Sequence, residues 1–173
     1  MIYLVRQGQT DWNLFKRANS ITETFLNQTG IEQSKQQAKN LKGVRFDACF
    51  CSPQIRTRQT CEIIYKGLIT FDDRLIEAIC GEFEGREETA EFWKEAWLAF
   101  QTGDKGTEKL EDFMKRSFNF CDMLKKQYSG MNVLVVTHAG NVRALAYYFR
   151  GKPEDYNFHV TPIVNGGLIT FEN

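Results

Sequence analysis

Residues 133–149 have the sequence VLVVTHAGNVRALAYYF and combine a strand with a helix in one stretch. The run at 133–137 is apolar up to Thr137 and rich in β-branched residues, which indicates a strand buried on both faces. The residues at 141–149 carry apolar side chains at helical spacing, so we expect a helix there. A buried strand followed directly by a helix is the unit from which parallel sheets are built.

The rest of the chain repeats this alternation of strand and helix. We expect further strands at 2–5, 46–51, 68–71 and 166–171, and helices at 29–41, 54–65, 87–100 and 109–127. Thr29 is the expected cap of the first of these helices, with Ala38 and Leu41 facing inward. The pattern predicts an α/β fold, a three-layer αβα sandwich around a mostly parallel central sheet. With no repeat or Pro/Gly-rich linker, residues 1–173 are expected to form a single domain.

The helix expected at 87–100 carries an aromatic stripe. Phe92, Trp93, Trp97 and Phe100 recur at helical spacing and either line a substrate pocket or pack on the sheet. Aromatic stripes on helices more often belong to the core, so we expect these side chains to pack on the sheet.

Composition excludes several classes of protein. The formal net charge is zero, which gives no electrostatic reason to expect nucleic acid or an anionic membrane as a partner. We see no apolar run with the length of a signal peptide or membrane span. The five cysteines include no CxxC pair, and only two histidines accompany them. We therefore expect reduced thiols in a cytoplasmic protein, with no metal site and no cofactor.

Polar residues follow three of the expected strands. Arg6 follows the first strand, Arg56 lies shortly after the second, and His138 follows the strand at 133–137. Ligands of open α/β sheets bind beyond the carboxyl ends of the strands, so these side chains are expected to meet. Guanidinium groups bind phosphate oxygens well, and an imidazole can carry a proton near neutral pH. The pattern predicts an oxyanion site, for which Arg58 is expected to be only a solvated neighbour.

Four segments of the chain resemble the histidine phosphatase superfamily, specifically its phosphoglycerate mutase-like branch. The segments are LVRQGQTDWN at 4–13, CSPQIRTRQTCEII at 51–64, LIEAICGEFEG at 75–85 and VVTHAGNVRAL at 135–145. The corresponding family patterns are LVRHGET with a following WN, SSP-LxR-AxQTA, LxE with GxxEG, and VTHGG. Their order and spacing match, so the resemblance spans nearly the whole chain and implies a phosphoryl-transfer pocket.

The resemblance implies a role for each matching residue. In the family, the histidine of RHG attacks phosphorus, whereas Gln7 stands at that position here. Other family residues hold the phosphoryl oxygens, and the matching positions are Arg6, Asn13, Arg56 and His138. An acidic residue protonates the leaving oxygen, which matches Glu77, with Glu82 and Glu84 as alternatives that more often shape their loop. His159 is expected at the surface.

Further departures from the family pattern lie close to Gln7. The glutamate after RHG is Gln9, and the loop KRANSITETFL at 16–26 replaces GRxQGxxDxPL. Lys16 and Ser20 stand at the glycine positions of that loop, and Phe25 stands at the proline. A carboxamide is a poor nucleophile, so the route through phosphohistidine is closed.

Three hypotheses follow. The first is a degenerate phosphoglycerate mutase- or phosphatase-like protein that binds phosphate or a phosphomonoester with little or no activity. The second is an active phosphomonoester phosphatase in which His138 or Glu77 activates water. The third is a non-enzymatic interaction scaffold. The partner expected from the first two is a small phosphorylated molecule.

Overall fold

The computed structural model describes residues 1–151 and 163–172. The strands are β1 (Ile2–Arg6), β2 (Ala48–Cys51), β3 (Thr70–Phe71), β4 (Val133–Thr137) and β5 (Leu168–Phe171). The α-helices are α1 (Asp11–Leu14), α2 (Gln28–Asn40), α3 (Ile55–Ile64), α4 (Ala90–Thr102), α5 (Leu110–Gln127) and α6 (Ala139–Arg150). Short 3₁₀ turns are η1 (Asp73–Leu75), η2 (Gly81–Phe83) and η3 (Asp104–Gly106).

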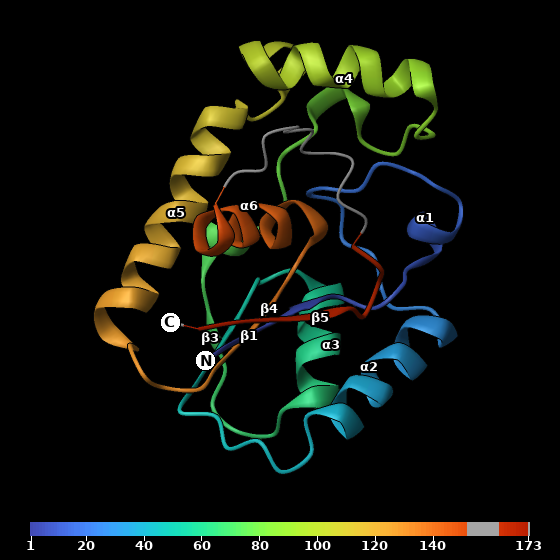
Figure 1. Ribbon diagram of the computed structural model, residues 1–173. Helices are drawn as coiled ribbons and strands as arrows, with labels where there is room; N and C mark the ends of the chain where they lie inside the picture. The colour runs from blue at the N-terminus through green and yellow to red at the C-terminus, as the bar shows by residue number, and fades with distance from the viewer. Residues whose placement is uncertain (152–162, 173) are drawn as a thin grey trace.

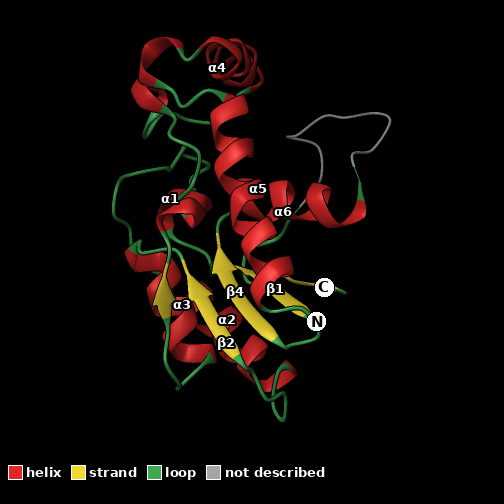
Figure 2. Ribbon diagram, turned by 90° about the vertical axis from the view of Figure 1, so that its left-hand side faces the viewer, coloured by secondary structure: helices red, strands yellow, loops and turns green. Residues whose placement is uncertain are grey.

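The five strands form one sheet in the order β3-β2-β4-β1-β5 (Figures 1 and 2). Strands β1, β2, β3 and β4 run parallel to their neighbours, and β5 pairs antiparallel with β1. Every residue of β4 is buried, as expected for the central strand of a covered sheet. The α/β prediction with a mostly parallel sheet is confirmed.

Helices cover both faces of the sheet. On one face, Cys49 and Cys51 of β2 pack with Cys61 of α3 in a cluster that also holds Leu41, just after α2. On the other face, α5 and α6 supply Phe120, Leu124, Val142 and Leu145 to a second cluster. All five cysteines are buried and free, as the sequence predicts. Figure 1 shows α4 apart from these layers, beyond the carboxyl ends of the strands.

Several boundaries differ from the expected ones. Helix α2 is capped by Asn27, whose side chain accepts from the Gly30 amide, and not by Thr29. Strand β2 begins at Ala48 and not at residue 46. Strand β3 keeps only two exposed residues at the edge of the sheet. Helix α6 begins at Ala139, two residues before the expected start, and α4 begins at Ala90.

No helix in residues 1–151 and 163–172 combines the length and the apolar character needed to cross a bilayer.

Candidate functional site

A cavity of about 250 Å³ opens beyond the carboxyl ends of the strands. Its floor comes from residues at or shortly after the carboxyl ends of β1, β2 and β4, among them Arg6, Gln7, Arg56 and Gly140. Asn13 and Glu77 also line it. Among the residues expected to form the oxyanion site, only His138 does not line the cavity.

Arg56 lies in the first turn of α3 and is 1% exposed. Its guanidinium donates to the Ser20 carbonyl at 2.8 Å and to the Thr22 carbonyl at 3.1 Å. No carboxylate of the described residues lies within ion-pair distance of it. Burial therefore lowers the pKa of Arg56 from its ordinary value, although the charges of Glu77 and Glu23 oppose this. Arg58, in contrast, is exposed and lies over the Phe71 ring, as a solvated neighbour would.

Arg6 ends β1 and points its side chain into the same cavity. One of its terminal nitrogens donates to the Ile163 carbonyl, and its buried Nε has no hydrogen-bond partner in the described residues. Burial lowers the pKa of Arg6 to about 10, with Glu77 acting in the opposite direction. One buried guanidinium, that of Arg56, and one half-buried guanidinium, that of Arg6, thus line the cavity without an ion-paired carboxylate among the described residues. This arrangement favours an anionic ligand.

His138 lies behind the floor of the cavity. Its ring is fully buried and its Nε2 lies 2.8 Å from the Ser52 hydroxyl, while Nδ1 has no partner in the described residues. Burial, together with the charges of Arg56 and Arg6, lowers the pKa of His138 well below its ordinary value. In this environment the neutral form of the imidazole is favoured over the protonated form. Sequence gives no direct signal for such complete desolvation.

Gln7 is 4% exposed and lines the cavity beside Arg6. Its side-chain Oε1 is buried and has no partner in the described residues. Its backbone carbonyl accepts from the Gly166 amide at 3.0 Å and from Asn165 Nδ2 at 3.4 Å. The residues just before β5 therefore fasten the loop that follows β1.

Asn13 lies in the short helix α1, which begins after that loop. Its Oδ1 accepts from the Thr10 amide at 3.0 Å, and the Thr10 hydroxyl accepts from the Asn13 amide in return. This reciprocal capping box fixes the start of α1. Asn165 also donates to Asn13 Oδ1 at 3.0 Å, so the amide group of Asn13 has a fixed position at the cavity wall.

Glu77 enters the cavity from the segment that follows η1. Its Oε2 accepts from the Gly140 amide at 3.1 Å, and its Oε1 accepts from the Ala78 amide at 2.9 Å. The Gly140 bond uses a free amide in the first turn of α6, where the helix dipole favours negative charge. The carboxylate is therefore held at one end of the cavity.

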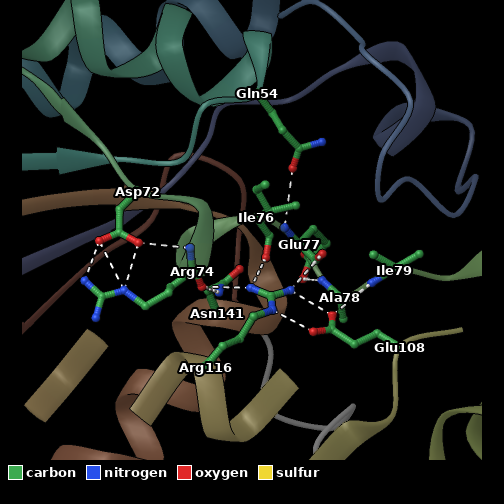
Figure 3. A network of polar contacts seen from close by, with 10 residues as sticks. All are labelled: Gln54, Asp72, Arg74, Ile76, Glu77, Ala78, Ile79, Glu108, Arg116 and Asn141. Carbon is green, nitrogen blue, oxygen red and sulfur yellow. Dashed lines mark hydrogen bonds and ion pairs between the residues drawn. The ribbon is translucent and has the colours of Figure 1, made fainter. Parts of the chain in front are cut away.

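Arg116 of α5 supports the segment that carries Glu77 (Figure 3). Its guanidinium donates to the carbonyls of Arg74 and Ile76, each at 2.7 Å, and to the Glu77 carbonyl at 3.2 Å. It is also paired with the Glu108 carboxylate, with a shortest distance of 2.6 Å. The sequence pattern does not single out this arginine, because its role depends on three carbonyls far away in the chain.

Glu84 holds the loop at 16–26. Its carboxylate accepts from the Ser20 and Thr22 amides, each at 3.0 Å, and from the Ser20 hydroxyl. Glu82 is exposed. These contacts agree with the expectation that the GEFEG segment shapes a loop. Lys16 stands where the family pattern has glycine. Its φ is 50°, in the region that favours glycine.

Four further charged residues line the cavity and were not singled out from the sequence: Arg17, Glu88, Glu108 and Arg143. Burial raises the pKa of Glu88, against the opposing charges of Arg6 and Arg143. Burial lowers the pKa of Arg143, against the opposing charge of Glu77. Arg143 lies in the segment VVTHAGNVRAL, one helical turn after Ala139. This spacing could have indicated from the sequence that Arg143 lies on the same side of the helix as Ala139.

The aromatic stripe of α4 forms the opposite wall. Phe92 and Phe100 are buried in a cluster with Phe83, as expected for core residues. The same two side chains also line the cavity, together with Trp93 and Trp97. The stripe does not pack on the sheet as expected, because its core partners are residues such as Phe83 and Cys80 that lie outside the strands. Part of the stripe borders the cavity.

No group of three or more His, Cys, Asp or Glu side chains suited to a metal ion occurs in the part of the chain that the structure describes. His159 lies outside that part.

The chain matches the sequence model of the histidine phosphatase superfamily (branch 1) over residues 2–172. It is 30% identical over 164 residues to a 2,3-bisphosphoglycerate-dependent phosphoglycerate mutase of Rhizobium meliloti, covering 83% of this chain and 76% of that protein. It is 28% identical to an uncharacterised phosphatase of Bacillus subtilis, covering 99% of this chain and 87% of that protein.

The fold is similar to that of a solved structure from Escherichia coli, a candidate α-ribazole-5′-phosphate phosphatase. The TM-score is 0.83 at 25% identity, and the match covers 96% of this chain and 87% of that one.

Proposed function

This chain belongs to the histidine phosphatase superfamily (branch 1), and from that premise we propose that it binds phosphate or a phosphomonoester with little or no phosphoryl transfer. The proposed binding groups are Arg6, Asn13 and Arg56. The single observation that supports the proposal most strongly is that Gln7 lines the same cavity as both arginines.

Gln7 accounts for the missing activity in this proposal. It stands where the family resemblance puts the attacking histidine, and its amide nitrogen is a poor nucleophile because the lone pair is delocalised into the carbonyl. Phosphoryl transfer relies mostly on positioning and charge neutralisation, so a pocket without its nucleophile can still bind the substrate. The chain thus keeps the groups for binding and lacks the group for attack.

The two arginines explain why the pocket would favour an anion. Arg56 is buried and Arg6 is half-buried with a buried Nε, and neither forms an ion pair with a carboxylate among the described residues. A buried charge without an ionic partner is costly, and a phosphate dianion would offset that cost with charge-assisted hydrogen bonds. We assign His138 to support of the floor through Ser52 rather than to direct phosphate contact, because its ring does not line the cavity.

A second candidate function is a working phosphatase in which a water molecule attacks phosphorus. The placement of the Glu77 carboxylate on the cavity wall favours this candidate, since a carboxylate there can accept a proton from water. His138 is less suited to that task, because it lies behind the floor. If water attacks phosphorus, phosphatase activity should survive the substitution Gln7→Ala and should be lost in Glu77→Gln.

The test uses the purified protein with inorganic phosphate and with p-nitrophenyl phosphate. Calorimetric titration should show saturable phosphate binding that is lost in Arg6→Gln and kept in Arg58→Ala, an exposed control. Hydrolysis of p-nitrophenyl phosphate should be very slow. A kcat of roughly 1–10³ s⁻¹, the ordinary range for enzymes, would overturn the assignment as a degenerate member. Absence of any phosphate binding would point instead to the interaction scaffold.

We also propose a cytoplasmic location, which the five free and buried thiols support.

A further inference from the structure

The cavity has two chemically different walls. The floor carries the guanidiniums of Arg6 and Arg56, and the opposite wall carries Phe92, Trp93 and Trp97 of α4. The start of α5 extends that apolar wall with Leu110 and Phe113. Charged side chains, those of Arg17, Glu88, Glu108 and Arg143, also line the cavity. A phosphate anchored at Arg6 and Arg56 would leave part of its molecule facing the aromatic side chains of α4.

The aromatic wall is held in a fixed position. The Phe92 ring meets the Phe83 ring edge to face, with centroids 5.6 Å apart, and meets the Trp93 ring at 4.9 Å. Helix α4 is capped by the Thr89 side chain at its start and by Gly103, with φ = 79°, at its end. Trp93 and Trp97 are four residues apart and so lie on the same side of the helix.

The volume of the cavity also exceeds what phosphate needs. The cavity measures about 250 Å³, and a liquid water molecule takes about 30 Å³. An inorganic phosphate, only a few times larger than water, fills part of this space. The remainder can accept an organic group about as large as one or two rings. Apolar pockets with a few convergent polar groups are the usual form of small-molecule sites.

We propose that this cavity selects phosphomonoesters whose organic part is an apolar ring system, seated against Trp93 and Trp97 with the phosphate at Arg6 and Arg56. This inference rests on the proposed function, because it requires phosphate to bind at the arginines. To that function the inference adds the chemical class of the organic part of the ligand. Stacking on an indole ring stabilises a planar apolar group more than a polyhydroxylated chain.

The first test compares ligands on the unmodified protein by calorimetry. The probes are inorganic phosphate, glycerol phosphate, 1-naphthyl phosphate and 1-naphthol. We expect 1-naphthyl phosphate to bind at least roughly tenfold more tightly than glycerol phosphate, equivalent to about 1.4 kcal/mol. Equal affinities for these two esters would overturn the inference, and so would 1-naphthol binding as tightly as its phosphate.

The second test uses variants of α4. Trp93→Ala and Trp97→Ala should each reduce the preference for the naphthyl ester by about tenfold or more, while leaving the affinity for inorganic phosphate unchanged. Leu98→Ala is the matched control, because Leu98 lies on the same helix and is 69% exposed. Retained phosphate affinity also shows that each variant is folded. An unchanged preference in both tryptophan variants would contradict the inference.

The two proposals fail in different ways. If none of the phosphorylated probes binds, the proposed function is wrong and the choice of organic group is wrong with it. If inorganic phosphate and both esters bind with similar affinity, the proposed function stands and only the inference about the aromatic wall is overturned.

Discussion

The Glu77 carboxylate occupies the space that a side chain on Gly140 would need. A Cβ built on Gly140 would lie 2.2 Å from Glu77 Oε1, while Glu77 Oε2 accepts from the Gly140 amide at 3.1 Å. The glycine is therefore required by close approach and not by an unusual backbone conformation. Its position in the first turn of α6 links the helix directly to the acidic group of the cavity.

We predict that Gly140→Ala displaces the Glu77 carboxylate and destabilises the protein by about 1–3 kcal/mol, as overpacking typically does. Chemical denaturation measures the loss. The control is the double variant Gly140→Ala/Glu77→Ala, in which the clash is absent. If the two changes add without any coupling energy, the close contact is not the cause.

Gln7→His should restore hydrolysis of p-nitrophenyl phosphate. Loss of a nucleophile costs up to about 10⁶ in other enzymes, so a partial recovery of about 10²-fold over the parent is expected. Gln7→Asn, which has no imidazole, should show no gain. The expected intermediate is a phosphohistidine that can be trapped by rapid acid quench. If Gln7→His gains nothing, the altered loop at 16–26 has disabled the site as well.

Arg116→Met should destabilise the protein by about 2 kcal/mol, because it removes the hydrogen bonds to three half-buried carbonyls and the ion pair with Glu108. Lys115→Met is the matched control on the same helix, and its exposed side chain predicts a change within about 0.5 kcal/mol. Thermal and urea unfolding of both variants provides the measurement. Equal stability of the two variants would show that the network in Figure 3 contributes little.

His138 should remain neutral throughout the physiological range. Its folded-state pKa lies well below that of the unfolded chain, which is about 6.5. Its contribution to stability is therefore fully present above pH of about 6.5 and is lost as the pH falls toward the folded-state pKa. NMR of the imidazole protons should show no titration of His138 between pH of about 8 and 6.

The variant His159→Gln assigns the signals in that experiment, since the chain has only two histidines. A His138 midpoint near pH 6.5 would contradict the prediction. The variant His138→Gln should in turn weaken the dependence of the unfolding free energy on pH below that value.

The strands at the centre of the sheet could be predicted because their burial is complete. β4 is apolar at every position but Thr137, and the structure gives the predicted bounds. The strand at the edge of the sheet was harder to predict from the sequence. β5 runs antiparallel to β1, and no local pattern distinguishes the direction of a short edge strand.

The sequence could predict which residue types gather at the site. It could not predict how deeply each side chain is buried. The strand-end argument named Arg6, Arg56 and His138, of which Arg6 and Arg56 line the cavity. Glu77, which also lines it, was expected only from the family resemblance. The position of His138 behind the floor depends on how Ser52 and the flanking helices enclose it, which is a tertiary effect. The contribution of Arg116 was likewise hidden, because its acceptors are backbone carbonyls that any sequence could supply.

The hydrogen bonds from Asn165 and Gly166 to the loop after β1 have a consequence for synthesis of the chain on the ribosome. Asn165 follows Asn13 by 152 residues in the chain, so the loop leaves the exit tunnel well before the groups that fasten it. A nascent chain can build β1, β2 and β4 while the cavity floor still lacks these bonds. The site is therefore completed only after most of the surrounding sheet can already have formed.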